Sequence, residues 1–304
     1  MLPDISPVNI DVLADDSFSR QGVELAVLRI DKIHPVVSGN KLFKLRYFLS
    51  EVMNSTHRTL LTFGGAYSNH LVATAYAGQS LGFKTIGVVR GEEPALLSHT
   101  LTTCRNYGMQ LYFMSRGAYS HKAEDGQLQI LRDEFGEFTW VPEGGYHPLG
   151  ARGAGEMLQA ADTSRFTHIC MALGTATSLA GCLMKALPHQ TLIAVPVLKG
   201  MTDMEERLRY LTGTTPVKQP VIWPDEHWGG YAKKEEQLLR FMNDCWQRYR
   251  LPLDFVYTAK MFYAAIKHME AGYFPRGSRL LCLHSGGLQG NLSLPPGTLD
   301  FEAG

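Results

Sequence analysis

The chain has 304 residues, of which 45% are hydrophobic and 19% charged, and its 29 basic and 29 acidic side chains leave no formal net charge at pH 7. This size and composition are typical of a globular protein with one large domain or two of ordinary size. The zero net charge argues against a nucleic acid or an anionic membrane as a partner.

The N-terminal segment and the cysteines favour a cytoplasmic protein. The first 20 residues carry four aspartates and lack a basic segment followed by an apolar run, which argues against a signal peptide. No apolar stretch approaches the roughly 18 residues of a membrane-spanning helix. The five cysteines are scattered, odd in number and free of Cys-x-x-Cys pairs, a pattern that favours reduced thiols.

Strand-like and helix-like segments alternate along the chain, with glycine-rich joints between them. The alternation predicts an open α/β sheet that is mostly parallel, and the lack of a repeat or a long linker indicates that any second domain is interleaved with the first. We expect strands at 23–30, 59–63, 84–90, 110–114, 167–173, 191–198 and 279–284. We expect helices after residue 38 and at 71–81, 96–107, 126–135, 153–161, 205–211, 233–249 and 261–271, with a further one ending at 187. Segment 140–150 is too rich in glycine and proline to be regular.

A lysine near the start of the first long helix is a candidate catalytic residue. Ser38 is expected to cap this helix, while Gly39 and Asn40 permit a tight turn before apolar residues recur at helical spacing. Lys41 lies about 45° from the centre of the apolar stripe and Lys44 about 105°, so we expect Lys41 to face the interior and Lys44 to face solvent. Lys41 is then either an ordinary residue with a packed stem and a solvated ammonium, or a desolvated amine that can attack a carbonyl.

Three loops, 64–70, 174–181 and 284–287, follow strands and combine glycine with hydroxyl or amide side chains. Ligands of open α/β sheets bind beyond the carboxyl ends of the strands, where such loops gather. The small residues of 174–181 let backbone N–H groups converge at a helix N-terminus, which predicts an anion site, most simply for phosphate. A plain strand-to-helix connector has the same composition, and the loop matches neither the Walker A nor the dinucleotide-binding pattern. No metal site is expected, because no ligand spacing is formed by His70, His147, His168 and His284.

Five motifs occur in order along the chain: Gly-Asn-Lys at 39–41, Gly-Gly-x-x-Ser-Asn-His at 64–70, Glu-Gly-Gly-x-x-Pro-Leu-Gly at 143–150, Gly-Thr-Ala-Thr-Ser-Leu-Ala-Gly at 174–181, and Val-Tyr at 256–257 ahead of His-Ser-Gly-Gly at 284–287. From about residue 24 to 287, this order resembles the family that contains 1-aminocyclopropane-1-carboxylate (ACC) deaminase and D-cysteine desulfhydrase. The resemblance implies pyridoxal 5′-phosphate (PLP) as cofactor and the tryptophan synthase β-like fold (PLP fold type II), which has two interleaved open-sheet α/β domains. It further implies a larger PLP-binding domain from residues 1–42 and 151–304, a smaller domain from 43–150, and a homodimer.

The resemblance also assigns roles to individual residues. Lys41 resembles the lysine that binds PLP covalently and, once displaced by substrate, acts as general base. Asn69 resembles the partner of the cofactor's 3′-oxygen, and Ser68 the hydroxyl beside the substrate carboxylate. Tyr257 resembles the tyrosine near the reacting carbon, and Ser285 the side chain facing the pyridine nitrogen, where a hydroxyl makes the ring a moderate electron sink. The implied phosphate cup is Gly174, Thr175, Ala176, Thr177 and Ser178. The implied substrate contacts are Tyr67, Ser68, Asn69, His70, Trp228 and Thr258.

Two positions bear on the substrate. The ring-opening deaminases of the family carry a glutamate after the tyrosine and a leucine before the last Gly-Gly, where this chain has Thr258 and Ser285. The hydroxyls resemble the desulfhydrase branch, so we expect a lyase or hydrolase that converts a D-amino acid such as D-cysteine to pyruvate, ammonia and sulfide. Bulkier residues than usual stand at Tyr67 and Thr177, Ser38 replaces a common glycine, and Trp228 stands where a second tyrosine lies near the cofactor.

Two alternatives remain open from the sequence. One is another reaction on the same cofactor, either ACC deamination or a D-serine-type dehydration. The other is a protein that keeps the fold and the anion site but only binds a ligand.

Overall fold

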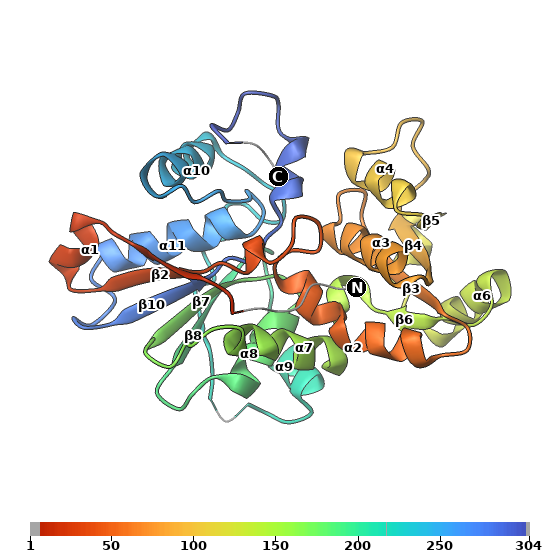
Figure 1. The fold of residues 1–304 in the computed structure, drawn as a ribbon, viewed down its shortest axis with the longest axis horizontal. Coiled ribbons are helices and arrows are strands. Elements are labelled where there is room, and N and C mark those ends of the chain that lie inside the picture. The colour runs from red at the N-terminus through yellow and green to blue at the C-terminus, as the bar shows by residue number, and fades with distance from the viewer. Residues whose placement is uncertain (1–6, 217, 302–304) are drawn as a thin grey trace.

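The computed structural model describes residues 7–216 and 218–301. Its two sheets lie in two lobes, seen at the left and right of Figure 1. The large lobe is built on a six-stranded sheet and the small lobe on a four-stranded sheet. The small lobe's strands come from one stretch of the chain, whereas the large lobe uses segments from both ends.

The six-stranded sheet has the order β1-β2-β10-β7-β8-β9. Only β1 is antiparallel to its neighbour, and β2 pairs directly with β10, so the first and last parts of the chain meet in the middle of the sheet. Its strands are β1 (Ile10–Leu13), β2 (Glu24–Leu28), β7 (His168–Leu173), β8 (Thr191–Pro196), β9 (Val221–Ile222) and β10 (Arg279–Leu283).

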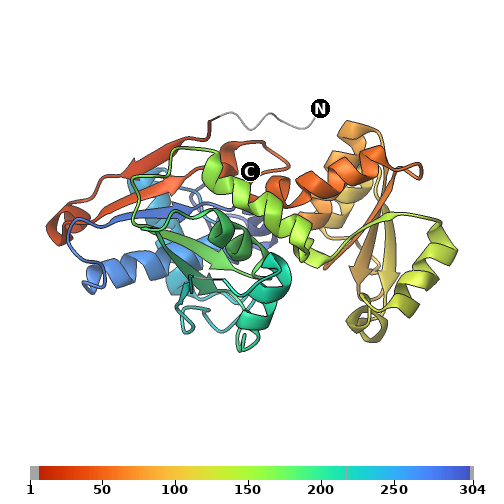
Figure 2. The ribbon, with the colours of Figure 1, turned by 90° about the horizontal axis from the view of Figure 1, so that it is seen from below.

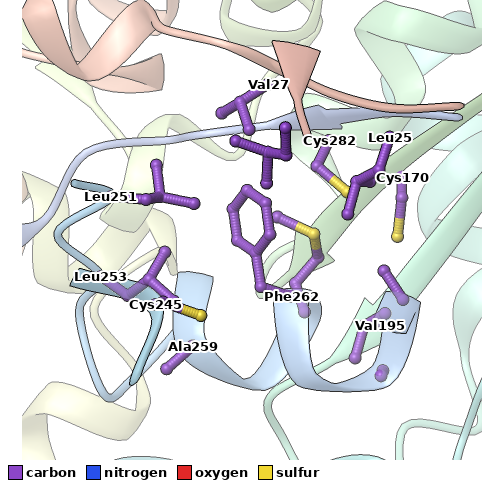
Figure 3. Close-up of a cluster of buried hydrophobic side chains, with 14 of the residues drawn as sticks. Leu25, Val27, Cys170, Val195, Cys245, Leu251, Leu253, Ala259, Phe262 and Cys282 are labelled. Atoms are coloured by element: carbon purple, nitrogen blue, oxygen red, sulfur yellow. The ribbon is translucent and has the colours of Figure 1, made fainter. Parts of the chain in front are cut away.

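Helices cover both faces of this sheet, as the alternating side chains of its strands require. Leu25 and Val27 face one side, where they pack with Phe262 and other residues of the cluster in Figure 3. Ala26 and Leu28 face the other side. The first face carries α1 (Asp16–Gln21), α10 (Glu236–Tyr249) and α11 (Thr258–Glu270), and the second carries α7 (Pro148–Gly155), α8 (Thr177–Lys185) and α9 (Met204–Thr212).

The four-stranded sheet is wholly parallel, in the order β5-β4-β3-β6. Its strands are β3 (Thr59–Gly64), β4 (Lys84–Arg90), β5 (Gln110–Met114) and β6 (Thr139–Val141). One face packs on α5 (Arg116–Ser120) and α6 (Asp125–Phe135), and the other on α2 (Asn40–Asn54), α3 (Asn69–Leu81) and α4 (His99–Asn106). Short 3-10 turns occur at Ile30–Lys32, Glu143–Gly145, Glu156–Gln159 and Leu288–Ser293.

Helices α2 and α7 run between the lobes and pack tightly on each other (Figures 1 and 2). Glycines allow this close approach. A Cβ on Gly153 of α7 would lie 2.0 Å from the carbonyl oxygen of Phe43 in α2, and a Cβ on Gly181 of α8 would lie 2.2 Å from that of Ala151. The backbone of α2, which carries the candidate lysine, is therefore fixed by contacts that admit no side chain.

The expected fold class is confirmed: two open α/β sheets, almost wholly parallel, formed from interleaved parts of the chain. The predicted domain boundaries at 42/43 and 150/151 stay a prediction, and both points fall inside helices, α2 and α7. All five cysteines are free and buried. In the described ranges, no helix is long and apolar enough to span a membrane.

Several local expectations were wrong. Helix α7 begins at Pro148, inside the segment expected to be irregular, because proline is well suited to a first helical turn and His147 caps it. Gly39, not Ser38, precedes α2 and forms no side-chain cap. The short elements β1, α1, α5, β6 and β9 were not expected, since few residues carry each periodicity.

The contact between α2 and α7 yields a stability prediction. Gly153→Ala should lower the free energy of unfolding by about 1–3 kcal/mol, because its methyl group meets backbone that cannot rotate away. Gly126→Ala in α6 is the matched control, since a Cβ there meets nothing within 4 Å, and it should stabilise by about 0.5–1 kcal/mol. Urea unfolding of the three proteins measures both effects, and equal stabilities for Gly153→Ala and wild type would contradict the packing described.

Candidate active site

The start of α2 is fixed against the loop that follows β10. Gly39 has φ +64°, and a Cβ there would lie 1.9 Å from the carbonyl oxygen of Ser285. The backbone N–H of Asn40 donates to the same oxygen at 3.3 Å, and the N–H of Gly39 donates to Ile30 at 2.9 Å. Only glycine satisfies both the left-handed backbone and the close approach, so the motif places Lys41 beside residues 285–287.

Lys41 is held by an amide side chain rather than by a carboxylate. Its Nζ donates to Oδ1 of Asn40 at 2.6 Å, and Nδ2 of Asn40 donates to Oγ of Ser178 at 3.1 Å. Burial lowers the pKa of Lys41 to about 8, an effect that the charge of Asp254 partly offsets. The amine lies 5.8 Å from the centroid of the Tyr257 ring. A substantial neutral fraction near pH 8 makes this amine a nucleophile or base.

The loop between β7 and α8 lies beside this lysine. Ala176 adopts the left-handed conformation (φ +69°) directly before α8, and the hydroxyl oxygens of Thr175 and Thr177 lie 2.9 Å apart. Thr177 and Ser178 are buried, and a Cβ on Gly174 would lie 3.4 Å from the Tyr257 ring. The predicted phosphate cup is thus a turn at a helix N-terminus, a geometry suited to an anion.

Lys44 is buried, contrary to the expectation that it faces solvent. Its side chain is 6% exposed, because the turn at Gly144 and Gly145 covers it, and its Nζ donates to the carbonyl of Gly144 at 3.3 Å. Burial and the charge of Lys41 lower its pKa to about 7. In the described ranges no carboxylate forms an ion pair with it. This second buried amine therefore favours an anionic ligand.

The loop after β3 brings Ser68 and Asn69 to the N-terminus of α3. Ser68 caps the helix by accepting from the N–H of Leu71, and a Cβ on Gly64 would lie 2.6 Å from its Oγ. Nδ2 of Asn69 donates to the carbonyl of Gly287 at 3.4 Å, whereas its Oδ1 is buried and has no partner among the described residues. Asn69 thus joins the small lobe to the loop after β10.

His70 is a neutral histidine with one free nitrogen. The Thr62 hydroxyl donates to the carbonyl of Val141 at 2.9 Å, so it accepts from Nε2 of His70, also at 2.9 Å. This assigns the proton to Nε2 and leaves Nδ1 as an acceptor, buried and without a partner among the described residues. Burial and the charges of Lys41 and Lys44 lower its pKa to about 3.

Thr258 begins α11 and Tyr257 directly precedes it, and Asp254 binds the backbone of both residues. The Asp254 carboxylate accepts the N–H groups of Val256, Tyr257 and Thr258 at 2.8–3.0 Å, and it also accepts the Thr258 hydroxyl at 2.8 Å. Thr258 is wholly buried, so its hydroxyl is engaged by Asp254 and its contact with substrate stays a prediction. Burial and the neighbouring Tyr231 raise the pKa of Tyr257 well above its ordinary value, which keeps the phenol protonated.

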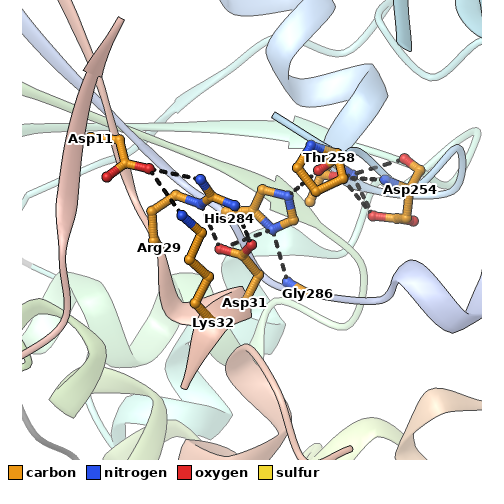
Figure 4. Close-up of polar contacts among 9 residues, drawn as sticks. Asp11, Arg29, Asp31, Lys32, Asp254, Thr258, His284 and Gly286 are labelled. Carbon is orange, nitrogen blue, oxygen red and sulfur yellow. Dashed lines mark hydrogen bonds and ion pairs between the residues drawn. The ribbon is translucent and has the colours of Figure 1, made fainter. Parts of the chain in front are cut away.

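A polar network behind the site supports the loop that carries Ser285 (Figure 4). Nε2 of His284 donates to the carbonyl of Pro252 at 2.6 Å, and its Nδ1 accepts the N–H of Gly286 at 3.3 Å. Asp31 lies 3.6 Å from that Nδ1 and forms an ion pair with buried Arg29. The half-buried Ser285 side chain thus projects from a rigid turn.

Trp228 and Tyr67, two of the expected substrate contacts, pack against aromatic neighbours in the structure, and their contact with substrate stays a prediction. Trp228 packs edge-on against Tyr263, with ring centroids 4.6 Å apart, because its backbone turns to φ +52°. The aromatic ring beside Tyr257 is instead that of Tyr231, at 6.1 Å. Tyr67 is 57% exposed and lies next to His99, so it stands at the rim.

The structure therefore gathers Lys41, Asn69, Tyr257, Ser285 and the 174–178 turn. Three further residues of the site were missed: Lys44, Asp254 and Tyr231. The spacing of Asp254 before the helix start is a capping signal that the sequence offered, whereas the burial of Lys44 depends on a turn one hundred residues away. In the described residues, no group of three metal-ligating side chains occurs.

Comparisons with known proteins agree with this geometry. The family profile described as "Pyridoxal-phosphate dependent enzyme" matches residues 14–286. The chain is 27% identical over 297 residues to the mitochondrial bifunctional D-cysteine desulfhydrase/ACC deaminase of Arabidopsis thaliana, covering 88% of this chain and 73% of that protein. It is 26% identical over 288 residues to the D-cysteine desulfhydrase of Serratia proteamaculans, covering 88% and 87%. The solved structure of an ACC deaminase homologue superposes with a TM-score of 0.81 at 23% identity, covering 96% of this chain and 92% of that one.

The buried lysines predict that stability rises with pH. Folding lowers the pKa of Lys44 from 10.5 to about 7, so between these values the unfolded chain binds the additional proton and the free energy of unfolding increases with pH. We expect the difference in unfolding free energy between wild type and Lys44→Met to change by up to about 1.4 kcal/mol per pH unit between pH 7 and 9. Urea unfolding of the cofactor-free proteins measures it, and a pH-independent difference would show that Lys44 keeps an ordinary pKa.

Proposed function

The chain belongs to the family of pyridoxal-phosphate-dependent enzymes, and from this premise we propose that it catalyses the α,β-elimination of a small D-amino acid, with D-cysteine as the preferred substrate and pyruvate, ammonia and sulfide as products. The observation that carries the proposal is the buried amine of Lys41. It lies between the anion-binding turn and the protonated phenol of Tyr257, with a pKa of about 8.

The residues present fit the cofactor. The 174–178 turn would offer a helix N-terminus to the phosphate. The ammonium of Lys44, which among the described residues bonds only to the carbonyl of Gly144, would supply a compensating charge. The Asn69 amide is only partly engaged, since Nδ2 makes one long bond of 3.4 Å to Gly287 and Oδ1 has no partner among the described residues, so its N–H groups would suit a polar oxygen on the ring. The orientation of an amide side chain follows from its hydrogen-bond partners. A ligand oxygen that competes with the carbonyl of Gly287 would therefore receive the hydrogen bond from Nδ2 of Asn69.

Bound PLP supplies an electron sink that stabilises negative charge on the substrate's α-carbon. Lys41, held by Asn40, takes the α-proton as general base. Ser68 contacts the substrate carboxylate at the N-terminus of α3, where the helix dipole favours an anion. Tyr257 is protonated and donates a hydrogen bond to the thiolate as the thiolate leaves the β-carbon.

Hydroxyl groups favour elimination from D-cysteine over ring opening of ACC. Ser285 would present a hydroxyl to the ring, and the position after Tyr257 is a buried threonine rather than a glutamate. Asp254 leaves no room for a second carboxylate at that position without charge repulsion. The names of the relatives include both D-cysteine desulfhydrase and ACC deaminase, so they support the class of reaction, and the choice between the two substrates rests on these hydroxyl groups.

The class of reaction is that of a lyase. The alternative expectation of a hydrolase was wrong, because the relatives are deaminases and desulfhydrases. In an elimination the bond to the β-substituent breaks as that group leaves, and water enters only when the imine product decomposes. Deamination of ACC and dehydration of D-serine use the same groups and remain the competing reactions. The homodimer and the cytoplasmic location stay predictions.

Lys44→Met should weaken binding of PLP about 10- to 100-fold, since a buried hydrogen bond to a charged group contributes about 1.5–3 kcal/mol. Binding of pyridoxal, which lacks the phosphate, should change less than about twofold. Fluorescence titration of the cofactor-free proteins with both ligands measures the contrast. An equal loss for the two ligands would place Lys44 away from the phosphate.

A product screen tests the function itself. Wild-type enzyme should release pyruvate and sulfide in equal amounts from D-cysteine, at a rate at least about tenfold above 2-oxobutyrate release from ACC. Lys41→Ala should lose about 10²–10⁴-fold in rate, and borohydride reduction followed by peptide mapping should label Lys41 in wild type only.

Ser285→Leu is the specificity variant of the screen. Thr258→Glu is less suitable, because it would bury a second carboxylate against Asp254. Ser285→Leu should lower the ratio of D-cysteine to ACC turnover. Faster release of 2-oxobutyrate than of pyruvate by the wild type would reverse the substrate assignment, and pyruvate from D-serine exceeding that from D-cysteine would identify a dehydratase.

A further inference from the structure

A fully buried lysine that has no role in the proposed reaction joins α11 to segment 227–233, which carries Tyr231. Lys260 is 0% exposed, and in the described ranges no carboxylate forms an ion pair with it. Its Nζ donates instead to two backbone carbonyls, those of His227 at 3.0 Å and Gly230 at 2.7 Å. Burial lowers its pKa to about 8, so the chain keeps this cation at an energetic cost.

The carbonyls that Lys260 binds are those that close two successive turns. The N–H of Gly230 donates to His227 at 3.0 Å, and the N–H of Lys233 donates to Gly230 at 3.2 Å. The backbone between them is left-handed at four positions, with positive φ at Trp228, Gly229, Gly230 and Ala232. Two of these four are not glycine, so this conformation requires support from outside the segment.

Tyr231 lies at the centre of this segment and contacts Tyr257. Lys260 is one helical turn along α11 from Tyr257, so a single side chain ties the segment to the helix turn that begins at the proposed catalytic phenol. Elsewhere the segment is attached by Glu226, which pairs with the exposed Lys267 at 2.8 Å, and by the packing of Trp228 on Tyr263.

The geometry points to Lys260 as a positioning residue: it fixes segment 227–233 so that Tyr231 meets Tyr257 in the active site. The inference rests on the proposed function only for its effect on turnover. The attachment of the segment to α11 is a property of the chain alone, and it is tested separately.

The first test is limited trypsin digestion of the purified enzyme. Lys233 and Lys234 are exposed, and they lie at the end of the second turn and directly after it, so cleavage there reports opening of the segment. Lys260→Met should raise the cleavage rate at these two sites about tenfold or more, whereas Glu270→Gln, an exposed side chain on the same helix, should change it less than twofold. Equal rates for Lys260→Met and wild type would overturn the inference.

The second test is a double-mutant cycle on turnover. Lys260→Met should lower kcat about 10- to 100-fold, as expected when a catalytic contact is displaced by about an ångström. In a Tyr231→Ala background the same substitution should cost less than about twofold, because the contact it supports is already lost. If the two substitutions lower kcat independently, so that the double variant loses the product of the two single losses, Lys260 is a structural residue only. The same conclusion follows if Lys260→Met speeds cleavage but leaves kcat unchanged.

Two outcomes outside the cycle are also decisive. If Lys260→Met does not fold, Lys260→Gln keeps neutral donors and should show smaller effects in the same direction. If the wild type fails to turn over D-cysteine, the proposed substrate is wrong, and the trypsin comparison still decides whether Lys260 holds the segment.

Discussion

The contact between Gly39 and the carbonyl of Ser285 is the constraint on which the site depends. It brings the segment before α2 against the loop after β10 so closely that no side chain fits between them. The same carbonyl accepts the N–H of Asn40, whose side chain holds both Lys41 and Ser178. One close backbone approach therefore sets the relative positions of the amine, the anion-binding turn and the last loop.

Several buried lysines in the molecule have no carboxylate partner among the described residues. Lys41, Lys44 and Lys260 all have lowered pKa values, and each is satisfied by carbonyl or amide oxygens instead of a paired carboxylate. The buried carboxylate of Asp254 instead accepts hydrogen bonds from the backbone at the start of α11. At Lys41 and Lys44, an anionic cofactor supplies the negative charge that the described carboxylates do not provide through an ion pair.

The sequence predicted the fold class and the principal motifs well, because strand and helix periodicities were clear and the motifs are local. It failed where the outcome depended on distant backbone. Lys44 faces outward on an isolated helix, yet the turn at Gly144 and Gly145 covers it. Trp228 and Tyr231 are three residues apart, and only the left-handed turns of their segment decide which ring reaches Tyr257.

The pairing of β2 with β10 determines the order in which the two sheets can form during synthesis. Strands β3 to β6 are contiguous, so the small lobe holds all its partners once about half of the chain has left the ribosome. Strand β2 has no parallel partner until β10 is made, and β10 is nearly the last segment to be synthesised. The edge of β2 that pairs with β10 is therefore unpaired through most of translation, and the contact of Gly39 with Ser285 that positions Lys41 forms only after β10 has been synthesised.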